Sequence, residues 1–113
     1  MGTRGEIRVA GGRGRKAWVN LHNSAHEQEA RRAVSKVNGW LGRQCERPTN
    51  FHLAEKISKA FGSSRSNASR MKPFETGSED ERIWREYAFH ARVIRREDGD
   101  GWRFVFTQTY PRE

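Results

Sequence analysis

The sequence predicts an α+β domain in which an antiparallel sheet of two hairpins carries helices on one face. Three observations support this fold class. Apolar residues alternate with polar ones near both ends of the chain, apolar residues recur at helical spacing between them, and the second face of both hairpins is basic. The predicted order is β-β-α-α-β-β, with residues 1–113 forming a single domain and the basic sheet face left open.

The first hairpin is predicted over residues 5–22, GEIRVAGGRGRKAWVNLH. Alternation matches Ile7 and Val9 with three apolar residues across a glycine-rich turn, namely Ala17, Val19 and Leu21. The opposite face would carry Arg8, Lys16, Trp18, Asn20 and His22. Register in a glycine-rich ribbon is weakly specified, so a slip of one residue would bury Trp18 instead.

Two amphipathic helices are predicted in the middle of the chain. Ser24, three residues before Glu27, indicates a capping box for the first helix, which should end at Gly42. Its apolar stripe comprises Ala30, Ala33, Val34, Val37 and Leu41. The second helix should begin at Thr49 or Asn50 and end at Gly62, with a stripe of Leu53, Ile57, Ala60 and Phe61. Flexible segments are expected at residues 1–5 and 63–80.

The last hairpin is predicted over residues 87–110, around a turn of Asp and Gly at residues 98–101. One face should belong to the core and carries Tyr87, Phe89, Ala91, Val93, Trp102, Phe104 and Phe106. The other face carries Ala88, His90, Arg92, Ile94, Arg103, Val105, Thr107 and Thr109. This second face combines cations, hydroxyl groups and short apolar side chains.

Composition points to a polyanionic partner. The formal net charge is +8 and the sequence pI is about 10.5. No apolar run approaches the roughly 18 residues that span a bilayer, and no signal peptide is evident, so we expect a cytoplasmic or nuclear protein without a membrane partner. The single cysteine, Cys45, excludes an internal disulfide and agrees with a reducing compartment. Because only 34% of residues are hydrophobic, the core should be small, which makes a homodimer one expectation.

Residues 57–71, ISKAFGSSRSNASRM, resemble the helix-turn-helix of bacterial DNA-binding proteins. The resemblance implies that a second helix enters the major groove, with Gly62 in the turn and Ser64 as the helix cap. It places four residues toward the groove, namely Arg65, Ser66, Asn67 and Arg70. The sequence departs from the pattern where small residues replace apolar anchors, at Ser58, Ser63 and Ala68. The alternative interpretation is a polar basic loop.

These features together predict a small, non-catalytic nucleic-acid-binding protein of the regulatory, viral or mobile-element kind. Its basic sheet face and the helix-turn-helix-like segment would bind DNA or RNA, as a duplex, with cations and hydroxyl groups positioned on the sugar-phosphate backbone. The predicted nucleic-acid-binding residues are Arg8, Arg13, Arg15, Lys16, Trp18, Arg65, Asn67, Arg70, His90, Arg92, Arg103 and Thr107.

Two other classes of function remain open at this point. A small ribonuclease would use His90 for proton transfer and Arg92 with Arg103 to stabilise phosphorane charge, with Glu86 or His22 as the second proton carrier. An inhibitor or interaction protein would dock its basic face on an acidic protein. No cofactor is predicted. No set of the four histidines and the single cysteine has the spacing of a zinc site, so no metal site is predicted either.

Overall fold

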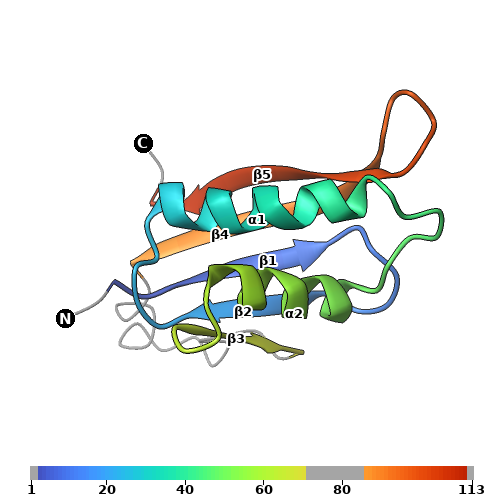
Figure 1. The fold of residues 1–113 in the computed structure, drawn as a ribbon. Coiled ribbons are helices and arrows are strands. Elements are labelled where there is room, and N and C mark those ends of the chain that lie inside the picture. Colours follow the sequence, from blue (N-terminus) through green and yellow to red (C-terminus); the bar gives the residue numbers. More distant parts are fainter. Residues whose placement is uncertain (1–2, 71–85, 112–113) are drawn as a thin grey trace.

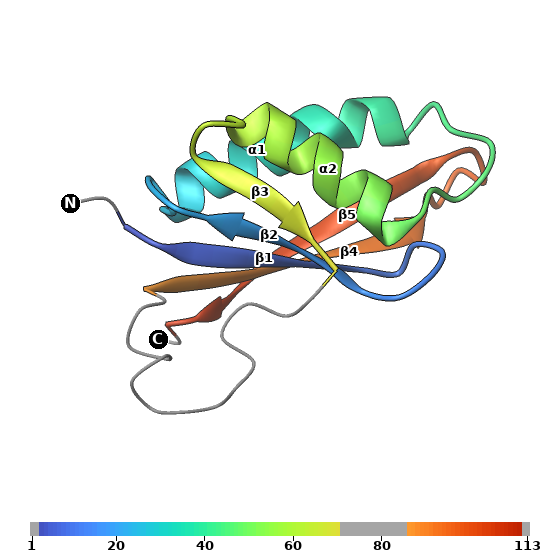
Figure 2. The same ribbon diagram turned by 90° about the horizontal axis from the view of Figure 1, so that it is seen from below.

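The fold was analysed in a computed structural model, which describes residues 3–70 and 86–111. Two helices cover one face of a five-stranded sheet, and no described element covers the other face (Figures 1 and 2). The α+β class and the one-sided placement of the helices are therefore confirmed. Residues 71–80 of the expected flexible segment lie outside the described residues.

The sheet is mixed rather than purely antiparallel. Its strands are β1 (Gly5–Ala10), β2 (Ala17–Leu21), β3 (Ser66–Ser69), β4 (Tyr87–Arg95) and β5 (Trp102–Tyr110). Their order is β3-β2-β1-β4-β5, and β1 pairs parallel with β4 at the centre. The prediction of an antiparallel-only sheet was wrong because the long connection between the hairpins, which includes both helices, returns the chain in the direction of β1.

Both hairpins have the predicted alternation. In the first, Ile7 pairs with Val19 and all core-facing residues are buried, while Trp18 pairs with Arg8 on the open face. The slipped register that would bury Trp18 is thus not adopted. In the second, a bulge between Ala88 and Phe89 makes Tyr110 the partner of Ala88, whereas alternation had predicted Thr109 on the face of Ala88. A bulge adds one unpaired residue, which period-two counting cannot foresee.

The helices are α1 (Glu27–Leu41) and α2 (Asn50–Phe61), and their predicted stripes pack against the sheet. The capping box was wrong. His26 is the N-cap of α1, and its side chain makes no capping hydrogen bond to the helix. Ser24 lies two residues before this N-cap, with a positive φ of 58°, so it is not in the capping position. Helix α2 begins as expected, because the Thr49 hydroxyl accepts a hydrogen bond from the His52 N–H at 3.2 Å.

Strand β3 occupies part of the segment in which the helix-turn-helix resemblance implied a second helix. Ala68 pairs with Val19 of β2 and packs against the core. Ser66 is buried, and its hydroxyl lies 2.8 Å from that of Ser58 and 3.0 Å from the Ser58 carbonyl. The small residues that replace the usual apolar anchors give a second helix no apolar side chains to pack on α2, whereas in the strand the buried Ser66 hydroxyl is satisfied by Ser58 and by the Gly62 carbonyl.

A buried asparagine at the start of α2 fixes the glycine-rich turn between β1 and β2. Asn50 is 2% exposed, and its side chain accepts from the Gly12 N–H at 2.7 Å and donates to the carbonyls of Gly14 and Arg15, both at 3.1 Å. The backbones of Arg13 and Asn50 are also hydrogen-bonded, at 2.9 Å. The basic turn is therefore held in a defined conformation by its hydrogen bonds to Asn50.

The outer edge of β5 is contacted by α1. The Phe104 N–H donates to the Asn38 side-chain oxygen at 2.9 Å. This hydrogen bond satisfies a backbone group on the outer edge of β5, which no other described strand pairs with.

We predict that Asn50→Ala lowers the free energy of unfolding by about 1–3 kcal/mol, because it removes a buried side chain that hydrogen-bonds several partly buried backbone groups of the β1–β2 loop. Urea unfolding followed by circular dichroism measures this loss. Lys59→Ala, at an exposed position of the same helix, is the control and should change stability by less than about 0.5 kcal/mol. A loss below about 1 kcal/mol for Asn50→Ala would show that the loop does not depend on this side chain.

Candidate nucleic-acid interface

A row of polar and aromatic side chains crosses the open face over all five strands. Cross-strand pairing joins Ser69 to Trp18, Trp18 to Arg8, Arg8 to His90, and His90 to Thr107. Because directly paired residues lie on the same side of a sheet, these five side chains are neighbours. The parallel pairing of β1 with β4 therefore combines both predicted basic faces into one surface, here called the sheet face.

The sheet face extends beyond this row through two more cations. Arg92 pairs with Val105 and is exposed, and Arg103 pairs with Ile94. Arg103 lies 3.9 Å from the carboxylate of Glu97, a residue whose side chain is 92% exposed. An ion pair this exposed stabilises little, so Arg103 can exchange it for a phosphate.

His90 lies at the centre of the positive charge. Its ring is half-buried, and its Nε2 atom is buried without a hydrogen-bond partner among the described residues. Burial lowers the pKa of His90, and the positive charges of Arg8, Arg92 and Lys16 lower it further. The imidazole is therefore neutral at neutral pH, with one nitrogen that donates and one that accepts.

A second group of predicted residues gathers at one end of the sheet. Arg13, Arg15, Lys16 and Arg70 line a groove beside the start of α2. The β1–β2 turn, the N-terminal end of α2 and the C-terminal end of β3 meet there (Figure 1). Lys16 belongs to both groups, because its charge also acts on His90.

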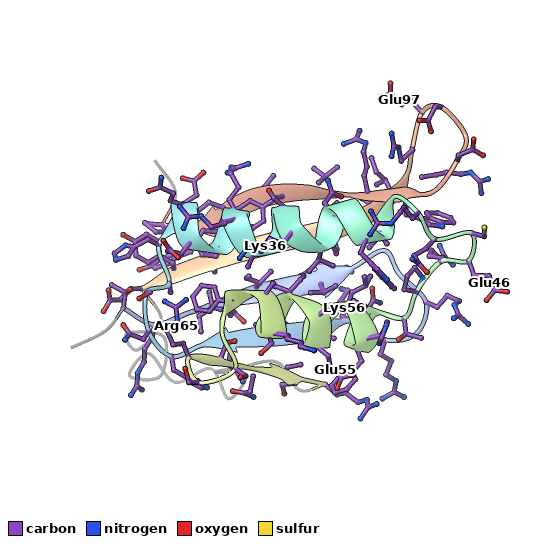
Figure 3. The ribbon with its side chains drawn as sticks, viewed as in Figure 1. Lys36, Glu46, Glu55, Lys56, Arg65 and Glu97 are labelled. Carbon is purple, nitrogen blue, oxygen red and sulfur yellow. The ribbon has the colours of Figure 1, made fainter. Side chains whose placement is uncertain are left out.

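Two predicted residues have local roles instead. Arg65 lies on the helix side of the sheet (Figure 3), where it donates to the Phe61 carbonyl and its guanidinium carbon is 4.7 Å from the Phe61 ring centroid. It is not part of the sheet face. Asn67 lies beside Asn20 on that face, and its side-chain oxygen accepts from His22 Nε2 at 2.6 Å.

The structure does not bring the expected second proton carriers to His90. Glu86 precedes β4 by one residue and is roughly 13 Å from His90 along an extended chain. His22 follows β2 and bonds to Asn67. Two residues of the sheet face, Glu6 and Tyr110, were not predicted; they pair with Ala88 from either side. Alternation alone would have placed Glu6 there, because it is two residues from Arg8.

Neither α1, with 15 residues, nor α2, with 12, has the length and apolar character of a membrane-spanning helix. Within residues 3–70 and 86–111, no three His, Cys, Asp or Glu side chains gather in a way that suits a metal ion. No protein-family model matches the chain, and no curated protein or solved structure shows significant similarity to it.

We predict that His90 makes folding less favourable at acidic pH. Its pKa in the folded protein is lower than in the unfolded chain, where it is about 6.5, so the unfolded chain binds more protons below that pH. The free energy of unfolding should therefore fall more steeply for the wild type than for His90→Gln as the pH is lowered from about 7.5 to about 5. Urea titrations at several pH values measure both slopes. Parallel slopes would show that the folded environment does not disfavour the charged imidazole.

Proposed function

We propose that the protein is a small, non-catalytic nucleic-acid-binding protein that contacts the sugar-phosphate backbone with its sheet face. The observation that carries this proposal is the alignment of Arg8, His90 and Thr107 in one cross-strand row, with Arg92 and Arg103 beside it. These residues come from strands far apart in the sequence. On a face that only contacts water, like charges are expected to be spread apart, whereas here the arginines lie together around His90.

The chemistry of the sheet face suits a backbone more than base edges. Arginine forks bind phosphate oxygens and release condensed counterions, which supplies affinity for any sequence. The hydroxyl groups of Ser69 and Thr107 lie at the two ends of the row, where they can position a phosphate or contact a 2′-hydroxyl. We therefore propose readout of nucleic-acid form in preference to sequence.

Trp18 adds a stacking surface to the cations. It is half-buried between Ser69 and Arg8 on the sheet face. An indole ring in this position can stack on an unpaired base or on the end of a duplex. A gel-shift panel of single- and double-stranded DNA and RNA at two salt concentrations tests which form is preferred. Absence of binding to every form would contradict the proposal and favour an acidic protein as the partner.

We predict that Arg92→Ala combined with Arg103→Ala weakens nucleic-acid binding and reduces the slope of log K against log salt by about 2, because two phosphate contacts are lost. Fluorescence anisotropy at several salt concentrations measures the slope.

The charge-matched control is Arg32→Ala combined with Lys36→Ala, because both residues are exposed on α1, and Lys36 lies away from the sheet face (Figure 3). This variant loses the same net charge but should retain most of the slope. Equal losses in the two double variants would show that only overall charge matters and would overturn the sheet-face proposal.

RNA cleavage is the second candidate function, favoured by the neutral His90 among three cations. We predict that His90→Ala retains binding within about tenfold, since one neutral hydrogen bond contributes about 0.5–1.5 kcal/mol. Denaturing gels of RNA recovered from wild-type and variant protein measure cleavage. Cleavage by the wild type that is lost in the variant would make His90 a catalytic residue and the protein a ribonuclease.

A further inference from the structure

The groove at the start of α2 is a second concave and positively charged surface. Its volume is about 630 Å³, within the range of small-molecule binding sites. Four cationic side chains line it, Arg13, Arg15, Lys16 and Arg70, and among the described residues Glu55 is the one carboxylate in the lining. Cations that converge on one concavity repel each other, so a multiply charged anion would stabilise this arrangement.

The walls of the groove are held in place by the fold. Asn50 fixes the backbone that presents Arg15 and Lys16. Opposite them, the guanidinium carbon of Arg70 lies 3.8 Å from the ring centroid of Phe51, so the two groups stack. Preorganised cations lose less conformational entropy on binding than cations on a free tail.

The side chains of Arg15 and Lys16 form no hydrogen bond or ion pair with any other described residue. The N-cap of α2, Thr49, also lines this groove, and the positive end of a helix dipole favours negative charge. A phosphate group would pair with the Arg15 and Lys16 side chains and would lie at the positive end of the helix dipole. The stacked pair of Arg70 and Phe51 adds a flat surface of the kind on which nucleobases stack.

We propose that this groove binds a nucleoside phosphate, with the phosphate on Arg15 and Lys16 and the nucleoside against Arg70 stacked on Phe51. The ligand is either a free nucleotide or the phosphorylated end of a nucleic-acid chain. Lys16 lines the groove and its charge also acts on His90 of the sheet face. A nucleic-acid chain bound along the sheet face can therefore place its phosphorylated end in the groove. The proposal does not depend on the sheet face, because a mononucleotide can occupy the groove alone.

Calorimetric titration of the wild type with 5′-AMP, with adenosine, and with short oligonucleotides phosphorylated at the 5′ end, the 3′ end or neither end tests this proposal. AMP should bind more tightly than adenosine. A preference for one phosphorylated oligonucleotide over AMP identifies a chain end as the ligand, whereas equal or tighter binding of AMP identifies a free nucleotide. Equal affinities for AMP and adenosine, with no effect of a terminal phosphate on the oligonucleotides, would overturn the proposal.

Variants locate the binding site. Arg15→Ala combined with Arg70→Ala should weaken AMP binding at least about tenfold, the loss expected for one charge-assisted hydrogen bond. Glu55→Gln should tighten it, because a carboxylate that opposes the phosphate is removed. Arg92→Ala combined with Arg103→Ala should leave AMP binding unchanged, which separates this proposal from that of the sheet face.

Urea unfolding checks that each variant is folded, and Arg15→Ala alone serves if Arg70→Ala disturbs the stack on Phe51. AMP binding that is insensitive to Arg15 and unaffected by Glu55→Gln would also overturn the proposal.

Discussion

The parallel pairing of β1 with β4 is the constraint on which the rest of the structure depends. It joins two hairpins that are separated by more than sixty residues and places Arg8 directly beside His90. A parallel pair requires a crossover connection, and here that connection carries both helices over one face of the sheet. The same pairing therefore buries the apolar face and leaves the basic one uncovered by any described element.

The fold sorts a sequence-wide excess of positive charge into separate surfaces. Arg8, Arg92 and Arg103 share the sheet face, whereas Arg15 and Arg70 face the groove at the start of α2. Other cations pair locally, as Arg31 does with Glu27 at 2.8 Å along α1. Net charge alone explains attraction to a polyanion, but the distribution of the cations over the surface determines where on the protein the polyanion binds.

Local patterns predicted the elements, and long-range pairing decided how they are assembled. Alternation assigned the core faces of both hairpins, and helical spacing assigned the buried stripes of α1 and α2, because burial imposes both periods directly. The parallel pair and β3 escaped prediction. Nothing local distinguishes SNAS as a strand, since its pairing with β2 and the buried contact of Ser66 with Ser58 arise only after folding. The groove was missed for the same reason: it depends on Asn50 reaching across 35 or more residues to the β1–β2 loop.

The hydrogen bond from Phe104 to Asn38 has a consequence for how chains meet one another. A long edge strand such as β5 is a template onto which a strand from another molecule can add. Here a helix side chain already occupies one of the outward backbone donors, so an incoming strand would have to displace Asn38 before it could pair along the middle of β5. The contact thus opposes runaway sheet growth in a concentrated solution, and it does so without placing a charge or a proline within the strand.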